Sequence, residues 1–242
     1  MAKTFLFILF SVGFIFLLNE VNFYFEKKWQ QERNTPPIVK IKAPKNYSLA
    51  ASGTHLHYSI TVSDKEDGES KFDEINTKEV LLEVKYISDS SRLSEAIKKS
   101  MEKDPPGLAA IRASNCFNCH GFETKVIGPG FTEIRKRYQP TATNIALLEK
   151  RIHEGSTGIW GKVSMPTHPE LAEEQIQNMV KWIMENASEN NIHYYVGTEG
   201  FLNVPQAGKA TALLLTASYT DHGIKNSGVR FKGRDGIVVR VK

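Results

Sequence analysis

One pentapeptide, C-x-x-C-H at residues 116–120, constrains this chain more than any other feature. Its cysteines, Cys116 and Cys119, are the only two among 242 residues, and His120 follows directly. Two thiols at this spacing can each form a thioether to one edge of the same porphyrin, and the next histidine can bind its iron. Because this chemistry needs both residue types at this spacing, the motif predicts covalent attachment of one c-type haem.

Three competing interpretations of the motif are weaker. A redox disulfide of the thioredoxin kind needs a βαβ setting, whereas the flanks here favour a helix followed by a loop rich in Gly and Pro. A structural zinc site needs four ligands, and the sequence has no second cysteine pair. Chance is disfavoured because an exported chain that kept free thiols would expose them to oxidation.

The N-terminus predicts export. Lys3 precedes an apolar run over residues 5–18, which has the length of the hydrophobic region of a signal peptide. No A-x-A-like cleavage site follows, and residues 21–25 can extend the run towards the length of a membrane span. We therefore expect residues 1–25 to be a signal peptide or, preferably, an uncleaved anchor that tethers the protein to the inner membrane through residues 5–25. Either one places the chain in the periplasm or at the cell surface of a bacterium.

Composition and charge exclude one class of partner. Apolar residues make up 40% of the chain and charged residues 24%, which is ordinary for a globular protein. The net charge is +4, and the sequence contains no dense basic stripe with interleaved aromatic residues. These features argue against nucleic acid as a partner.

Segments of β character flank a helical centre. Residues 26–37 are polar and end in two prolines, which is typical of a linker. The expected strands are 38–41, 55–62, 80–87, 212–219 and 229–241. The two β segments, 38–90 and 192–242, are each small for an independent core. We therefore expect one all-β, sandwich-like domain built from both segments, with the helical unit at about residues 92–188 between its halves; two separate modules are the alternative.

A six-coordinate haem iron needs a second axial ligand from the helical unit. The candidates are His153, Met165, His168, Met179 and Met184. The apolar stripe of an expected helix explains Met179 and Met184, and the dipole at a helix end explains His153. Packing does not explain Met165, which lies in an irregular segment before a proline. Its thioether is a suitable soft ligand, so Met165 is the preferred axial ligand and His168 the alternative.

Several short motifs follow one another in the helical centre. They are Cys116–His120, Ile127–Phe131, Arg137–Tyr138, Ile152–Gly155, Gly158–Gly161, Met165–Pro166 and Trp182–Ile183. In these motifs residues 106–186 resemble a class I cytochrome c, carrying a single haem, of the small bacterial type found in Pseudomonas. The resemblance implies a compact all-α fold around one covalent haem.

The resemblance also implies roles for individual residues. A carbonyl at the position of Pro129 accepts a hydrogen bond from the proximal histidine in that family, which implies that Pro129 orients His120. Phe131 and Trp160 are implied to line the haem pocket, Trp160 near a propionate, and Met165 is implied to be the sixth ligand. An iron that binds both axial ligands is saturated, so the expected function is one-electron transfer and not catalysis.

The flanks carry a second resemblance. In Val62–Asp64 and Asp67–Gly68, residues 36–88 are similar to the PKD-like β modules beside cytochrome domains in exported Bacteroidetes proteins. Ser218–Asp221 resembles the stretch that follows the cytochrome in those proteins. The resemblance implies a neighbourhood of sugar dehydrogenase or carbohydrate-binding modules.

The expected partners are redox proteins, with a dehydrogenase as donor and a terminal oxidase or another cytochrome as acceptor. The protein is then an electron carrier, or the cytochrome subunit of a dehydrogenase, and not itself an enzyme. A haem-based sensor with a labile Met165 ligand is the alternative. Lys125 and Lys162 near the expected haem edge are candidates for steering an acidic partner, and a solvated surface accounts for both more simply.

Overall fold

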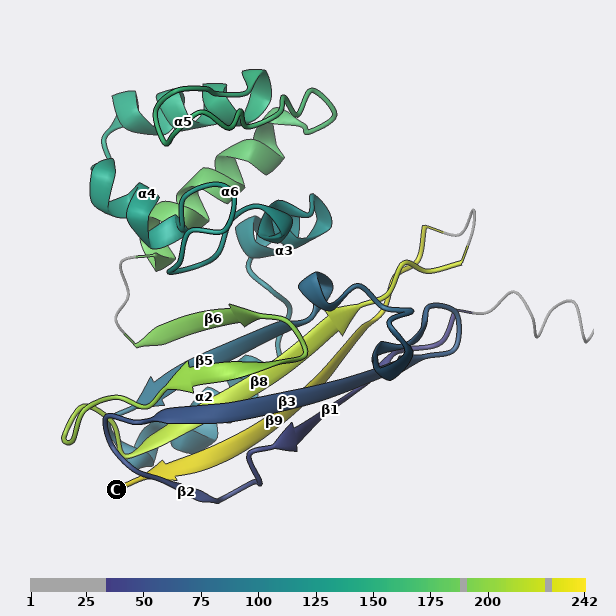
Figure 1. Cartoon of the computed structure of the whole chain (residues 1–242), viewed down its shortest axis with the longest axis vertical. Helices are drawn as coiled ribbons and strands as arrows, with labels where there is room; N and C mark the ends of the chain where they lie inside the picture. Colours follow the sequence, from purple (N-terminus) through teal and green to yellow (C-terminus); the bar gives the residue numbers. More distant parts are fainter. Residues whose placement is uncertain (1–33, 188–190, 225–227) are drawn as a thin grey trace, which may run out of the picture.

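The computed structural model describes residues 34–187, 191–224 and 228–242. The expected signal peptide or anchor, residues 1–25, and most of the linker lie outside the described residues. Among the helices that are described, none combines the length and the apolar character that crossing a membrane requires. Figure 1 shows a helical part on one side of two β-sheets, with strand β6 nearest to it.

Strands from both flanks are neighbours in each of the two sheets. In the first sheet β3 (His55–Asp64) pairs with β1 (Ile38–Ala43), β4 (Gly68–Glu69) and β7 (Glu199–Asn203). The second sheet has the order β2 (Leu49–Ala50), β9 (Lys232–Val241), β8 (Ala212–Thr220), β5 (Leu81–Ile87) and β6 (Ile192–Val196). All pairs are antiparallel except β2 with β9. The long polypeptide between β5 and β6 is the helical part.

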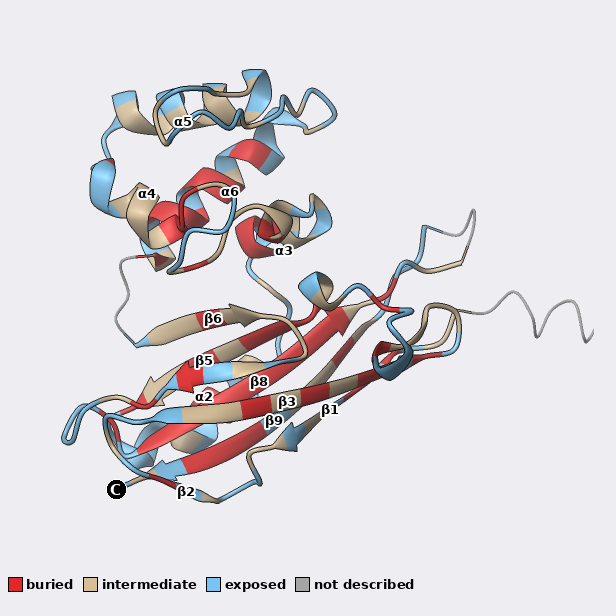
Figure 2. Cartoon of the chain, in the orientation of Figure 1, coloured by how far each residue is buried: buried red, intermediate tan, exposed pale blue. Residues whose placement is uncertain are grey.

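The two sheets share one hydrophobic core. Side chains alternate between the two faces of β3, and Tyr58, Ile60 and Val62 are the buried ones. They pack in one cluster with side chains of the second sheet such as Leu82, Leu213, Leu215 and Val239. Figure 2 shows the long buried stretches of β8 and β9. Each leucine or isoleucine buried here contributes about 1.5–3 kcal/mol relative to an exposed position.

Helix α2 (Leu93–Ser100) belongs to the β part of the molecule. The sequence prediction placed it in the helical unit that begins at about residue 92. The structure corrects this boundary, because Ala96 packs with Ala212 and Leu214 of β8. Neighbouring residues along a strand point to opposite faces. Helix α2 therefore covers the face of the second sheet that looks away from the first, and β8 is buried on both faces.

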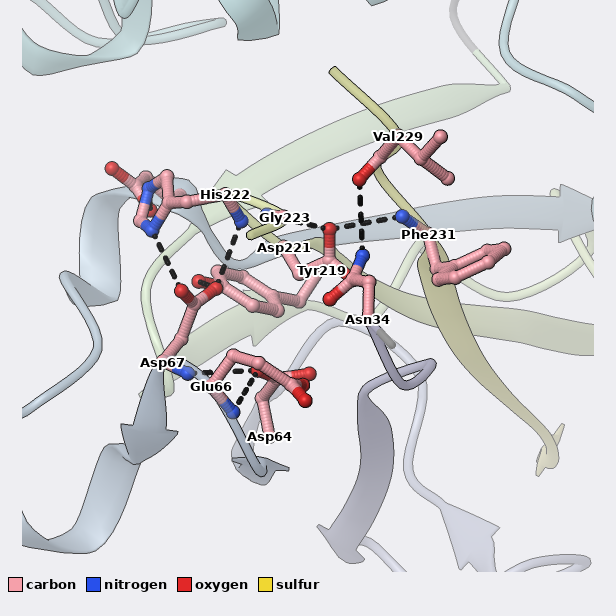
Figure 3. A network of polar contacts seen from close by, with 11 residues as sticks. Asn34, Asp64, Glu66, Asp67, Tyr219, Asp221, His222, Gly223, Val229 and Phe231 are labelled. Atoms are coloured by element: carbon pink, nitrogen blue, oxygen red, sulfur yellow. Dashed lines mark hydrogen bonds and ion pairs between the residues drawn. The ribbon is translucent and has the colours of Figure 1, made fainter. Parts of the chain in front are cut away.

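A polar network joins the N-terminal flank to the connection between β8 and β9 (Figure 3). Asp67 accepts hydrogen bonds from the Tyr219 hydroxyl at 2.7 Å and from the backbone N–H of His222 at 2.9 Å. Asn34 donates to the buried carboxylate of Asp221 at 3.0 Å. Buried carboxylates are costly without such partners, so these bonds hold the two flanks together.

The helical part is built on α6 (Glu173–Asn186). It contacts α3 (Pro106–Ala113), α4 (Phe131–Arg137) and α5 (Ala142–Glu154). Its buried face includes Ile176, Met179, Val180 and Ile183, as the expected apolar stripe predicted. Gly107 allows α3 to cross α6 closely, because a Cβ there would lie 2.1 Å from the carbonyl oxygen of Asn178.

The structure differs from the prediction in the C-terminal flank. Strands β6 and β7 precede the two expected strands, and β9 begins at Lys232, not at residue 229. Only Tyr194 of β6 is buried, so the period-two pattern that identifies a strand is weak there. The Tyr194 ring lies 4.8 Å from that of Phe122 and 5.4 Å from that of Trp182. Strand β6 thus joins the second sheet to the helical part.

Candidate functional site

The two thiols lie on one tight turn after α3. Residues Cys116–Asn118 form a 3-10 turn, in which the backbone N–H groups of Cys119 and His120 donate to the carbonyl of Cys116 at 3.1 and 2.9 Å. Asn115 starts this turn in the left-handed region, at a φ of 55°. Both cysteines are free thiols, and burial raises the pKa of the Cys116 thiol to about 11. The turn therefore presents two unpaired thiols next to an imidazole.

The loop after the turn fixes the imidazole of His120. Its Nδ1 lies 2.8 Å from the carbonyl oxygen of Pro129, and since a carbonyl only accepts, Nδ1 carries the proton and donates. The ring of Phe131 stacks on it at a centroid distance of 5.6 Å. Gly128 lies against the imidazole, because a Cβ there would be 2.6 Å from Cε1. Burial lowers the pKa of His120, which favours the neutral form with its lone pair on Nε2.

These side chains line a cavity of about 260 Å³. Its walls include apolar side chains from four helices, such as Ile111, Ile134, Leu148 and Met179. A non-helical segment over residues 156–168 forms another wall. The cavity brings together every site residue that the sequence singled out, namely Cys116, Cys119, His120, Pro129, Phe131, Trp160 and Met165.

The lining of the cavity shows which candidates for a second axial ligand can reach it. Met165, His168 and Met179 line it, whereas His153 and Met184 do not. Met179 is 1% exposed and packs in the apolar core of the helical part. Met184 is buried in a separate apolar cluster, and His153 lies in the last turn of α5. Met165 and His168 are the candidates outside the helices that reach the cavity.

The backbone holds Met165 in a defined position. Its N–H donates to the carbonyl of Ser156 at 2.8 Å, and its carbonyl accepts from the N–H of Ser156 at 3.2 Å. Gly155 makes this approach possible, since its φ is 81° and a Cβ there would lie 2.8 Å from the Met165 carbonyl oxygen. The ring of His168 contacts the carboxylate of Glu170 instead, at 3.0 Å through Nδ1.

The rim of the cavity is both apolar and basic. Ile127 and Val163 are 51% and 67% exposed, which is unusual for large apolar side chains. Lys125 and Lys162 also line the cavity, and the Lys125 amine lies 3.4 Å from the carbonyl of Trp160. This combination leaves an exposed apolar patch with positive charge beside the cavity mouth.

Sequence reasoning missed two kinds of site residue. Gly128 and Gly155 carry no chemistry, yet each allows the close approach that positions a candidate iron ligand. Arg151 lines the cavity and donates to the hydroxyl of Tyr138 at 2.5 Å. On the sequence it looks like any polar residue of an amphipathic helix. Gly128 and Gly155 lie inside motifs that the sequence analysis identified, but the contacts that these glycines allow could not be inferred from the motifs.

The donor set fits one haem. Two unpaired thiols, an imidazole with its Nε2 lone pair available and a thioether all reach one apolar cavity. Thiols attach the macrocycle, and imidazole and thioether are ordinary axial ligands of its iron. A helical unit with these four donor groups at one cavity is typical of proteins that bind a c-type haem covalently.

Comparison with known proteins gives the family. Residues 106–187 match the family model described as Cytochrome c. Cytochrome c-551 from Pseudomonas aeruginosa is 30% identical over 82 residues, which are 34% of this chain and 76% of that protein. Cytochrome c2 from Rubrivivax gelatinosus is 35% identical over 82 residues, 33% of this chain and 95% of that protein. The crystal structure of Nitrosomonas europaea cytochrome c552 aligns at 30% identity and a TM-score of 0.31, and covers 32% of this chain and 95% of its own.

The chain belongs to the cytochrome c family through a class I domain at residues 106–187. Its cofactor is one covalently bound haem c, and the function of this domain is electron transfer. The predictions of a class I haem segment and of one covalent haem are confirmed by these matches. The described residues outside the matched segment are rich in β-structure.

Proposed function

We propose that the protein carries single electrons between exported redox proteins, with its haem attached to Cys116 and Cys119 and ligated by His120 and Met165. One observation carries this proposal most: all four side chains reach the same apolar cavity. Bound there, the haem supplies a reversible one-electron couple. An iron with both axial positions filled has no place for a substrate, which supports a carrier and not an enzyme.

Several residues of the chain set the properties of this site. The Pro129 carbonyl fixes the tautomer of His120 and makes its Nε2 a better donor to the iron. Phe131 and the apolar helix faces exclude water, which disfavours the extra charge of the ferric state and raises the reduction potential. Trp160 packs under the guanidinium of Arg137 at 4.9 Å and shields one edge of the cavity.

Met165 is preferred over His168 because its thioether is a suitable soft ligand of haem iron. The backbone holds both residues, since the N–H of His168 donates to the carbonyl of His153 at 3.2 Å. The paired hydrogen bonds with Ser156 hold Met165 at the cavity without help from the cofactor. His168 is the alternative ligand, and its contact with Glu170 would orient its ring as the Pro129 carbonyl orients that of His120.

Optical spectra of the haem-loaded protein test the ligand. In Met165→Ala we expect the methionine–iron charge-transfer band of the oxidised protein to disappear, and the reduced protein to bind carbon monoxide rapidly. The matched variant His168→Ala is expected to keep the band and to exclude carbon monoxide. Absence of the band from the unmodified protein, together with rapid carbon monoxide binding in His168→Ala but not in Met165→Ala, would assign the iron to His168. Rapid carbon monoxide binding by the unmodified protein would instead favour a haem-based sensor with a labile Met165 ligand.

The exposed rim of the cavity is the proposed docking surface. Ile127 and Val163 offer apolar contact, and Lys125 and Lys162 offer positive charge that attracts an acidic partner. A small surface of this kind suits the brief encounters of electron carriers. We propose a dehydrogenase, for example of a sugar-oxidising system, as donor, and a terminal oxidase or another cytochrome as acceptor.

The flanks are proposed to form one PKD-like sandwich domain from residues 38–90 and 192–242, as in the Bacteroidetes proteins that they resemble. The pairing of β3 with β7, and of β5 with β6 and β8, supports a single domain. Residues 1–25 are proposed to export the chain to the periplasm or cell surface and to tether it to the inner membrane. The haem would then face partners outside the cytoplasm.

A further inference from the structure

A second cavity, of about 520 Å³, lies where the β part meets the haem segment. Its walls come from the end of β8, the start of β9, the turn at residues 77–79 and helix α3. Phe117 and Asn118, the two residues between the haem-attachment cysteines, also line it. The cavity is therefore adjacent to the haem site but opens on another set of side chains.

Positive charge dominates this second cavity. The lysines and arginines that line it are Lys78, Lys103, Arg112, Arg230, Lys232 and Arg234. Among the described residues of its wall, only Glu79 and Asp104 carry a carboxylate, and the Nε2 atom of His222 already lies 3.0 Å from Glu79. The cations therefore outnumber the carboxylates that could neutralise them.

Asp104 is shared by three of these cations. Its carboxylate contacts Arg112 at 3.2 Å, Arg234 at 3.0 Å and the Lys232 amine. The side chains of Arg112, Arg234 and Lys232 are 10%, 13% and 17% exposed, respectively. Asp104 carries one negative charge and the two guanidinium groups carry two positive charges, so an excess remains even where the Lys232 amine is deprotonated, and water screens a buried excess poorly. Glu83 also interacts with Lys232 and Asp104, but burial raises its pKa and it does not line the cavity. The cations that line the cavity therefore exceed the carboxylates that line it.

The titration of Lys232 reflects the same imbalance. Burial, and next the positive charge of Arg112, lower the pKa of the Lys232 amine to about 7. Arg112 is held in place as well, because it donates to the Ser218 hydroxyl at 2.9 Å and to the Ser218 carbonyl at 3.3 Å. The cations are consequently fixed before any ligand arrives, which reduces the entropy lost on binding.

We propose that this cavity binds a small multivalent oxyanion against Arg112, Lys232 and Arg234. The guanidinium of Arg234 can meet the oxygens of a phosphate or carboxylate group in paired hydrogen bonds, and such charge-assisted bonds are strong. The guanidinium of Arg112 already donates to Asp104, Ser218 and the Glu79 carbonyl, so it contributes its positive charge. A ligand with at least two negative charges supplies the charge that Asp104 alone does not. Lys103 and Arg230, which are exposed at the same cavity, attract the anion from solution.

Calorimetric titration of the full haem-loaded chain tests this site. Inorganic pyrophosphate and citrate serve as the phosphate and carboxylate probes. We expect saturable binding of one anion per chain, which weakens as sodium chloride is added because salt screens the charges. Tighter binding of pyrophosphate would assign the phosphate class, and tighter binding of citrate the carboxylate class. Absence of saturable binding for both probes overturns the proposal.

Three variants locate the binding. Arg234→Gln removes a mostly buried guanidinium of the cluster. Lys103→Gln removes an exposed cation, and this variant is expected to keep the fold because no buried contact is lost. Arg234→Gln is expected to weaken binding by about tenfold, the value of one charge-assisted contact, and Lys103→Gln is expected to weaken it less, because an exposed charge is screened by water. Lys98→Gln, on the exposed side of α2 outside the cavity, makes the same change in net charge and is expected to bind as the parent does. Equal affinity in all variants, or an equal loss in Lys98→Gln, contradicts the site.

Discussion

At the scale of single residues, the contact between Gly128 and His120 holds the imidazole in place. The loop after the haem-attachment turn folds back on His120, and no side chain fits at residue 128 unless the ring moves.

Replacement of Gly128 by alanine tests that contact. The new Cβ would lie 2.6 Å from Cε1 of His120 and 3.0 Å from its Nδ1, so the ring has to move away from the Pro129 carbonyl. Gly128→Ala is expected to lower the free energy of unfolding of the haem-loaded protein by about 1–3 kcal/mol, as other overpacked sites do. Denaturant titration followed by haem absorbance measures it.

Gly236→Ala is the matched control for this prediction. Its Cβ would have the Leu215 carbonyl oxygen, at 3.8 Å, as its nearest neighbour, and the change is expected to leave stability nearly unaltered. Equal stabilities of Gly128→Ala and the parent would show that the loop yields and that Gly128 does not position the imidazole.

The chemistry of the haem site could be predicted from the sequence, but the contact at Gly128 could not. The motif of Cys116, Cys119 and His120 is recognised by its spacing, and Met165 stood out because no periodic stripe explained it. The part played by Gly128 depends on how the loop folds back on His120, a contact that no local pattern encodes.

At the scale of helices and strands, the burial pattern of each segment explains whether the sequence predicted it correctly. Strand β8 is buried along almost its whole length and was expected. Strand β6 was missed because Tyr194 alone is buried. The expected helical unit began at about residue 92 and so included α2, because an apolar face such as that of Leu93 and Ala96 does not say which surface covers it.

At the end of α5, Gly155 lies against the loop that carries Met165. Gly155→Ala places a side chain at a φ of 81° and 2.8 Å from the Met165 carbonyl oxygen. The loop is expected to shift, so the methionine–iron band weakens and carbon monoxide binds the reduced protein faster than it binds the parent. Stopped-flow mixing measures the rate.

Gly158→Ala provides the comparison for this loop. It has a similar φ of 84°, but a Cβ there meets no atom within 4 Å. The backbone strain is then matched and the contact with Met165 is absent. If both variants bound carbon monoxide equally fast, strain alone and not the approach of Gly155 to Met165 would explain the change.

At the scale of the whole molecule, long-range pairing governs the architecture. The composition of the flanks indicated strands, but the order that places β5 between β6 and β8 joins segments far apart in the sequence. The buried cluster around Asp104 is equally long-range, since it joins the start of the haem segment to β9. Charge counts along the chain did not reveal it, because its members are scattered.

This cluster predicts a pH dependence of stability. The pKa of Lys232 is lowered from 10.5 to about 7 by burial and by Arg112, so between these values the unfolded chain binds more protons than the folded one. The cost of burying the charged Lys232 amine is fully present below pH 7. The free energy of unfolding therefore rises as the pH increases above 7. Between pH 7 and 9 the free energy of unfolding is expected to increase by about 1–3 kcal/mol.

Urea titrations at several pH values measure this rise. In Lys232→Gln the increase is expected to vanish, whereas Lys98→Gln, whose amine is exposed, is expected to keep it. A rise of the same size in Lys232→Gln would assign the effect to other groups.

Strands β5 and β6 are hydrogen-bonded neighbours, and the haem segment lies in the connection between them. After β5 the chain crosses the outer face of the sheet in α2, and the haem segment starts beside Asp104, which contacts Lys232 at the start of β9. The segment returns at the other end of the strands, where the backbone N–H of Tyr86 donates to the carbonyl of Asn191 at 2.7 Å. In topology the whole connection from β5 to β6 is an enlarged hairpin loop. Loop-closure entropy grows only with the logarithm of loop length, so the sheet tolerates so large a loop. The haem segment is thereby attached to the sheet at two points, which restricts its motion relative to the sheet more than a single linker would.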